Sequence, residues 1–235
     1  FVKMVNKYKA FCNVPDHNNY QQVIHNNFNV YAPFEHIPES ETATQEDIPA
    51  TMLFLKHIFG TSDIKYTHPK TKEKSSINEL ELGTDYIQLL YKQPTQILPI
   101  LCLVSRENGT GKTTFAKWLK LLFTANVAIV GNSELKNNFN KAWATKLLII
   151  CDEAKIDKQE VVERVKMLST ADKIFMEGKG QDHEEIDFFG KFVFLTNNEK
   201  NFIQITEDDV RYWVRKVPIA RDLNISLLND MLEEI

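Results

Sequence analysis

Residues 97–114 read ILPILCLVSRENGTGKTT, and this stretch decides the fold. Its first part, up to Val104, is a continuous apolar run, which is typical of a strand buried on both faces of a parallel sheet. A loop that contains Gly109 and Gly111 follows the run. An amphipathic helix is predicted after the loop by apolar residues at helical spacing: Phe115, Trp118, Leu119 and Leu122. The order strand, glycine loop, helix predicts an α/β fold.

The glycine loop has the residues that a phosphate-binding P-loop needs. Glycines let the backbone N–H groups approach a phosphate, Lys112 can reach the β and γ oxygens, and the Thr113 hydroxyl can bind Mg²⁺. Arg106 stands where the usual pattern has its first glycine. We therefore predict a site for ATP and Mg²⁺ whose nucleotide contacts come from Asn108, Gly109, Thr110, Gly111, Lys112, Thr113 and Thr114.

A second apolar run, KLLIIC at 146–151, ends in the acidic pair Asp152 and Glu153. In open α/β sheets the carboxyl ends of the strands present the ligand-binding residues. We expect Asp152 to hold Mg²⁺ together with Thr113, and Glu153 to orient and deprotonate a water molecule. The pair therefore indicates hydrolysis, and a small-molecule kinase fits poorly.

Two further apolar runs, 126–130 and 191–196, complete a predicted parallel sheet of βαβ units. The last of them leads into Asn197 and Asn198, at the same edge of the sheet. An asparagine there can hydrogen-bond both the γ-phosphate and the lytic water.

Outside this core the patterns predict less regular structure. We expect an exposed polar loop over Thr61–Asn78, between a helix that ends near Gly60 and a second helix over Thr84–Lys92. The chain reads as a piece of a larger protein. Four regions are predicted: an irregular N-terminal segment (1–45), a helical pre-ATPase region (46–96), an ATPase core (97–221) and the start of a C-terminal helical region (222–235).

Composition narrows the possible functions. The net charge of −4 excludes a basic surface over the whole molecule, so any contact with nucleic acid must be local. No apolar run is long enough to span a membrane and no signal peptide opens the chain, so a cytoplasmic protein is expected. The cysteines at 12, 102 and 151 read as core residues, and Cys12 with His17 and His25 lacks the spacing of a zinc site.

Together these motifs resemble the superfamily 3 helicases, in particular the primase-helicase ATPase domains of phages, plasmids and poxvirus-type replication proteins. The resemblance covers most of the chain. It rests on the order and spacing of the P-loop, the Asp152–Glu153 pair, KIFMEGKGQD (173–182), LTNNE (195–199) and VRYWVR (210–215). The sequence departs from the family at Arg106, and at Asn108, which stands one place before the family's frequent asparagine.

The resemblance implies an AAA+-like core that assembles as a ring, normally a homo-hexamer, in bacterial or viral-host cytoplasm. It implies movement along single-stranded or forked DNA, with a fused or associated primase as a further partner. By the family's pattern Asn198, rather than Asn197, takes the sensor role. Lys179, with Lys173, would contact nucleic acid, and Arg211 would be the arginine finger, with Arg215 as second choice.

Three alternatives stay open. An AAA+-type loader that remodels a protein partner would need the same ATPase but no Lys179 in a pore. A nucleotide-binding oligomerisation module without turnover is favoured by Arg106. The glycine-flanked Lys179 can also be a solvated turn, and the paired arginines can serve solubility and protect an edge strand.

Overall fold

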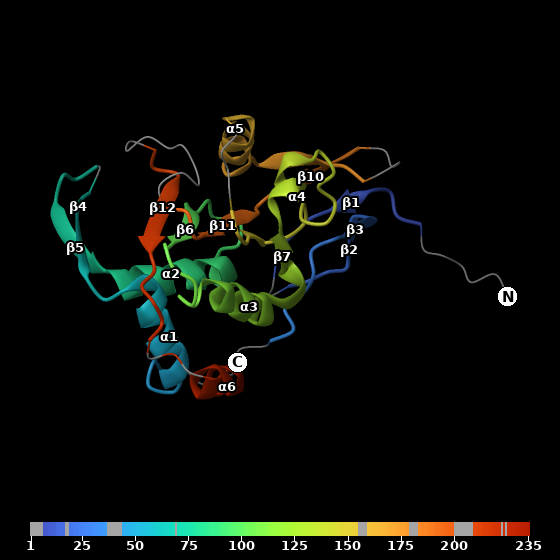
Figure 1. Ribbon diagram of the computed structural model, residues 1–235. Coiled ribbons are helices and arrows are strands. Elements are labelled where there is room, and N and C mark those ends of the chain that lie inside the picture. The colour runs from blue at the N-terminus through green and yellow to red at the C-terminus, as the bar shows by residue number, and fades with distance from the viewer. Residues whose placement is uncertain are drawn as a thin grey trace.

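The computed structural model describes residues 7–16, 19–36, 44–68, 70–154, 159–178, 183–199, 209–221, 223 and 225–235. A parallel sheet lies at its centre (Figure 1). Its strands are β6 (Ile100–Val104), β7 (Val127–Val130), β8 (Leu148–Cys151), β11 (Lys191–Thr196) and β12 (Tyr212–Lys216), in the order β12-β6-β11-β8-β7. The predicted α/β class, with an AAA+-like P-loop core around a parallel sheet, is confirmed.

Alternation along the buried strands sends side chains to two separate cores. In β6, Leu101 and Leu103 face one core, whereas Ile100, Cys102 and Val104 face the other. A strand buried on both faces therefore reads as one unbroken apolar run, which is why this stretch was recognisable in the sequence.

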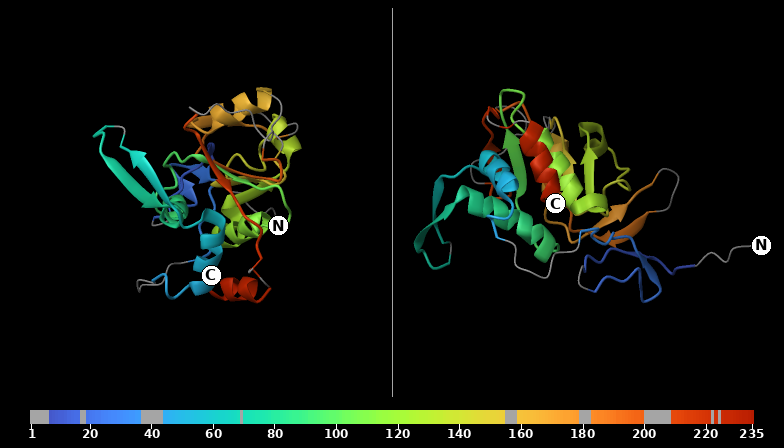
Figure 2. Two further views of the ribbon diagram at one scale, coloured as in Figure 1. Left: turned by 60° about the vertical axis from the view of Figure 1, so that its left-hand side comes forward. Right: turned by 90° about the horizontal axis from the view of Figure 1, so that it is seen from below.

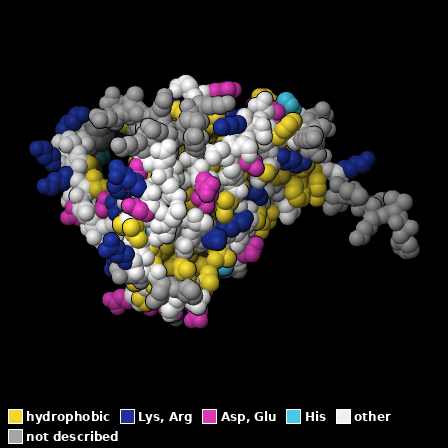
Figure 3. All heavy atoms as spheres, viewed as in Figure 1, with side chains coloured by type: hydrophobic (Ala, Val, Ile, Leu, Met, Phe, Trp, Pro, Cys, Tyr) yellow, Lys and Arg dark blue, Asp and Glu magenta, His cyan; other side chains and the backbone are white. Residues whose placement is uncertain are grey.

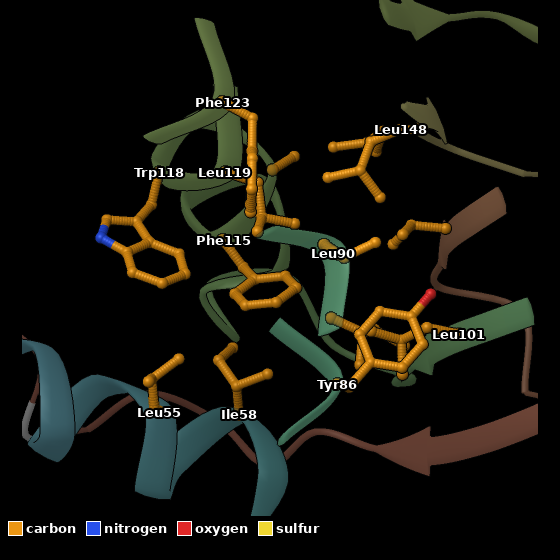
Figure 4. Packing of buried hydrophobic residues seen from close by; sticks show 14 of the residues in the cluster. Leu55, Ile58, Tyr86, Leu90, Leu101, Phe115, Trp118, Leu119, Phe123 and Leu148 are labelled. Atoms are coloured by element: carbon orange, nitrogen blue, oxygen red, sulfur yellow. The ribbon is translucent and has the colours of Figure 1, made fainter. Parts of the chain in front are cut away.

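Helices cover both faces of the sheet. The first core is covered by α1 (Pro49–Phe59), α2 (Glu79–Lys92), α3 (Lys112–Phe123) and α6 (Ile225–Glu233). Figure 4 shows Ile58 of α1, Leu90 of α2 and Leu119 of α3 around Phe115. The second core contains one face of α5 (Gln159–Leu168). Short elements α4 (Asn132–Lys136) and η1 (Thr124–Asn126) connect the strands.

The polar segment predicted as a loop over Thr61–Asn78 is instead an antiparallel hairpin of β4 (Asp63–Thr67) and β5 (Lys74–Asn78). Most of its side chains are exposed on both faces, so no apolar alternation marked it as a strand pair. The helix after it begins at Glu79 rather than Thr84, because the Asn78 side chain caps it by accepting a hydrogen bond from the Leu80 N–H (3.0 Å).

The remaining strands lie outside the central sheet. A small N-terminal sheet has the order β1-β3-β2, from β1 (Phe11–Cys12), β2 (Val23–Ile24) and β3 (Asn27–Asn29). A second antiparallel strand pair consists of β9 (Lys173–Met176) and β10 (Glu184–Asp187).

The cysteines, candidate metal ligands and helix lengths add little to the assignment of a function. Cys102 and Cys151 are fully buried, and burial raises the pKa of both thiols. Among the described residues, which do not include His17, no group of three or more potential ligand side chains could hold a metal ion. No helix in the described parts of the chain combines the length and apolar character needed to cross a bilayer.

One buried charge in the fold has a measurable consequence. Lys191, at the start of β11, is only 5% exposed, and its ammonium group donates to the carbonyl oxygens of Pro94 and Phe189. Burial lowers its pKa to about 7. Since an unfolded lysine titrates near its ordinary value of about 10.4, the unfolded chain binds more protons between these two pH values.

Stability should therefore rise with pH between about 7 and 10.4 through this residue, by at most ~1.4 kcal/mol per pH unit. Below about pH 7 the full cost of charging Lys191 is present. We expect the free energy of unfolding of the wild type, relative to Lys191→Met, to increase over this range in urea titrations. Parallel curves for the two proteins would show that Lys191 stays charged in the fold.

Candidate functional site

The glycine loop lies between β6 and α3, as its sequence predicts. Gly109 and Gly111 have φ of +69° and +83°, a region that favours glycine. A Cβ on Gly111 would also lie 3.3 Å from Cε2 of Phe54 in α1. Helix α3 begins at Lys112, so the N–H groups of its first turn point toward the space above the loop.

Lys112 lies beneath the loop with its ammonium group held in place. The side chain is buried, and its Nζ donates to Ser105 Oγ, to Thr110 Oγ1 (2.9 Å) and to Asn197 Oδ1 (2.8 Å). Burial lowers the pKa of Lys112, and the carboxylates of Asp152 and Glu107 act in the opposite direction. Among the described residues no carboxylate forms an ion pair with this ammonium group, which is therefore suited to an incoming anion.

Thr113 and Asp152 meet although 39 residues separate them. The Thr113 hydroxyl donates to Asp152 Oδ2 at 3.1 Å, at the carboxyl end of β8. A cavity of about 240 Å³ opens beside this pair. It is lined by the predicted nucleotide-contacting residues, Asn108, Gly109, Thr110, Gly111, Lys112, Thr113 and Thr114, and by Asp152, Glu153, Leu195, Thr196 and Asn197.

Glu153 has an unusual backbone conformation at the cavity. Its φ is +55°, in the left-handed region that residues other than glycine rarely adopt. Asn132, which follows β7, donates from Nδ2 to the Glu153 carbonyl oxygen at 3.0 Å. Strained backbone of this kind concentrates at functional sites, and here it places the exposed Glu153 side chain on the cavity wall.

The asparagine nearest the phosphate loop differs from the one selected by sequence. Asn197, not Asn198, lines the cavity and contacts Lys112; its Nδ2 also donates to Asn108 Oδ1 at 2.7 Å. The Asn198 N–H donates to Thr196 Oγ1 at 3.1 Å, and the residue is not part of the cavity lining. Which of two adjacent residues turns inward depends on where the strand ends, and the residue types alone do not reveal it.

Two contacts that sequence reasoning missed support the loop from behind. Nε2 of His57, in α1, lies 2.9 Å from the Thr110 carbonyl oxygen. The Ala220 N–H donates to the Gly109 carbonyl oxygen at 3.1 Å. Both partners lie far from the loop in sequence, so no local pattern could have indicated them.

Arg106, the departure from the P-loop pattern, points away from the cavity. Its Nε donates to Glu199 Oε2 at 3.1 Å, and 64% of its side chain is exposed. The residue is absent from the cavity lining. The substitution of arginine for glycine therefore leaves the described geometry of the loop intact.

The two arginines of the last strand lie in different settings. Arg211 immediately precedes β12 and pairs with Asp209 (2.7 Å, Nε to Oδ1), which raises the pKa of the guanidinium. Arg215 is more buried and binds both Glu79 Oε1 (3.1 Å) and the Ile58 carbonyl oxygen. Arg215 therefore joins β12 to α1 and α2, whereas Arg211 remains on the surface.

The predicted nucleic-acid contacts are only partly visible. Lys173 is exposed on β9 and pairs with Glu185 at 3.2 Å. Lys179 lies outside the described residues, so the structure does not place it.

One family model matches the middle of the chain. The family of unknown function DUF5906 matches residues 103–215, the segment that runs from β6 to β12. No curated protein matches the chain.

Among solved structures, the apo form of the NrS-1 C-terminal region (305–718) aligns with a TM-score of 0.70 and 16% identity over 96% of this chain and 52% of that chain. The A form of the same region gives a TM-score of 0.69 and 18% identity, with the same coverage. A JCV helicase bound to a small molecule aligns at a TM-score of 0.43 and 15% identity, over 75% of this chain and 47% of that chain. This TM-score is too low to indicate a shared fold. The chain thus has the fold of the NrS-1 C-terminal region and spans about half the length of those solved chains.

Proposed function

We propose that the chain is the ATPase motor of a superfamily 3-type DNA helicase, which binds ATP with Mg²⁺ at the glycine loop and hydrolyses it. The observation that carries the proposal is the meeting of Thr113 and Asp152 at 3.1 Å, beside the buried ammonium group of Lys112. Two motifs far apart in sequence thereby supply a hydroxyl, a carboxylate and a cation to one cavity.

The donor set fits the proposed ligands. The hydroxyl and carboxylate oxygens are ligands that Mg²⁺ prefers, and the first-turn N–H groups of α3 with Lys112 suit a triphosphate. Mg²⁺, when bound, would neutralise negative charge on the phosphates. A site with few protein ligands is usual for this ion, because waters and phosphates complete its coordination.

Glu153 and Asn197 then have distinct roles in hydrolysis. Glu153, on the cavity wall, accepts the proton of the attacking water. Asn197 already contacts Lys112, so its side chain reports on the occupancy of the loop and replaces Asn198 as our candidate for the polar sensor.

The position of Arg211 supports assembly of the proposed motor as a ring. The residue after it, Tyr212, pairs with Ile100 at the start of β6, whereas the phosphate loop follows Val104 at the other end of that strand. The strand spans roughly 13 Å. Arg211 therefore lies too far from its own phosphate loop to contact a nucleotide there, and we assign it to the site of the neighbouring subunit.

Replacing Lys112 by alanine should abolish ATP binding and turnover, because the buried ammonium group contacts the ligand. Mg²⁺-dependent phosphate release and binding of a fluorescent ATP analogue measure both effects. Lys117→Ala is the matched control, since Lys117 is exposed on the same helix. Turnover by Lys112→Ala at the wild-type rate would refute the P-loop assignment.

Movement along DNA is the further step that distinguishes a helicase from a loader of protein partners. We expect ATP-dependent strand displacement on forked DNA. Lys179→Ala should keep the basal ATPase and lose displacement. An active ATPase that never displaces a strand would favour the loader.

A further inference from the structure

The β4–β5 hairpin projects from the body of the molecule in every view (Figures 1 and 2). Its five cross-strand pairs run from Asp63 opposite Asn78 to Thr67 opposite Lys74. Nearly all of its side chains are exposed, so the hairpin contributes little to either core. Isolated two-stranded hairpins are marginally stable in water. Contacts with the rest of the fold must therefore stabilise the hairpin. Its exposed side chains indicate a role outside the core.

These stabilising contacts lie at the base of the hairpin. Asn78 Nδ2 donates to the Thr61 carbonyl oxygen (2.8 Å), and the Glu79 N–H donates to the Ser62 carbonyl oxygen (2.9 Å). Glu79 also pairs with Arg215 of β12. The φ of Gly60 is +90°, which favours glycine at this corner of the structure. The hairpin is thus tied to the edge of the central sheet while its far end extends into solvent.

The charge of the hairpin is opposite to that of the whole chain. Between Asp63 and Asn78 the sequence contains four lysines and two acidic residues, although the chain carries a net charge of −4. The lysines are Lys65, Lys70, Lys72 and Lys74, all exposed. Figure 3 shows Lys and Arg side chains gathered at the left of the molecule, where Figure 1 places β4 and β5.

None of these lysines forms an ion pair within the described part of the chain. The two acidic side chains of the hairpin are engaged elsewhere: Asp63 accepts from Asn78, and Glu73 accepts from Thr71. The ammonium groups are therefore available to an anion from outside.

Donors converge on one part of the ribbon. Lys65 lies opposite Ser76, and Lys74 lies opposite Thr67, so the register places both lysines on the same face as diagonal neighbours. A hollow of about 530 Å³ is lined by Lys65, Tyr66, Thr67, Lys74, Ser75 and Ser76. Lysine and hydroxyl donors are the side chains that contact nucleic-acid phosphates. Tyr66 lies opposite Ser75 on the other face of the ribbon, and this residue, 43% exposed, is available there for stacking on a base.

We propose that the β4–β5 hairpin binds the sugar–phosphate backbone of nucleic acid. The inference rests on the proposed function, in which the chain moves along DNA, and it adds a contact separate from Lys173 and Lys179. A two-stranded ribbon has the dimensions to enter the major groove of a duplex, and its lysines equally suit a single strand. The shared chemistry is the repeating phosphate, read without regard to sequence.

The test is a salt series of binding titrations with the whole chain, using labelled single-stranded and duplex oligonucleotides. Lys65→Gln/Lys74→Gln is compared with Lys92→Gln/Lys117→Gln, which removes the same charge from exposed positions on α2 and α3. For a single strand, losing two phosphate contacts should make the negative slope of log K against log salt shallower by about 1.4 and weaken binding about 25-fold near 0.1 M salt. For a duplex the slope should become shallower by about 1.8. The control variant should match the wild type.

Other outcomes would overturn the inference. Equal affinities and slopes for both double variants would mean that the lysines only protect exposed strand edges. Loss of binding to phosphatidylserine vesicles, with nucleic-acid binding unchanged, would assign the hairpin to a membrane surface. The ATPase of each variant is measured in parallel. Lysine-dependent binding in a chain without ATPase would support the hairpin contact and refute the motor.

Discussion

Replacing Arg211 by alanine should lower ATP turnover by about 10³–10⁵-fold while leaving ATP binding nearly unchanged. The guanidinium lies at the far end of β6 from its own phosphate loop, so in the proposed ring it would act across a subunit interface. In this chain the guanidinium pairs with Asp209, whose side chain is only 4% exposed and also pairs with Lys166. A planar guanidinium that reaches the γ-phosphate would neutralise the charge that develops during hydrolysis.

Subunit mixing tests this assignment. Arg211→Ala and Lys112→Ala proteins, each inactive alone, should regain part of the ATPase when mixed, because some interfaces then join an intact loop to an intact arginine. Arg106→Ala is the matched control, since it removes another exposed, carboxylate-paired arginine and should change turnover little. Mixed rings that form and remain inactive would exclude action across the interface.

Replacing Glu153 by glutamine should reduce turnover by about 10²–10⁴-fold and preserve binding of ATP and Mg²⁺. The amide keeps the size of the side chain and the strained backbone position but cannot accept a proton from water. Single-turnover hydrolysis and nucleotide-binding titrations separate the two effects.

Glu107→Gln is the matched control for Glu153. Glu107 is an exposed carboxylate whose charge acts on Lys112, but it does not line the cavity. We expect its substitution to leave turnover within a few-fold of the wild type. Undiminished hydrolysis by Glu153→Gln would show that another group activates the water.

The parts of the fold that the sequence predicts best are those in which local pattern and global burial agree. The strands β6 and β8 are apolar throughout, and β11 is apolar between its polar ends, because both faces of the sheet are covered. The glycine loop was recognisable because Gly109 and Gly111 have positive φ angles, which favour glycine. The β4–β5 hairpin escaped prediction because neither of its faces is buried. The start of α2 was missed because its cap, Asn78, belongs to that hairpin.

At the site, residue types predicted the chemistry but not every position. Thr113 and Asp152 could be paired because both follow buried strands that end at one edge of the sheet. The choice between Asn197 and Asn198 depends on the exact end of β11, where one residue reverses the direction of a side chain. The His57 contact with the loop depends on the packing of α1, and nothing local in the sequence encodes it.

The most direct test of the central claim is a structure of the chain with Mg²⁺ and a nonhydrolysable ATP analogue, determined by electron cryomicroscopy. We expect the β and γ phosphates in the cavity between Lys112, Thr113 and Asp152, in a six-fold ring with Arg211 of the next subunit facing the γ-phosphate. A cavity that stays empty at saturating analogue, or an analogue bound elsewhere on the chain, would contradict the account.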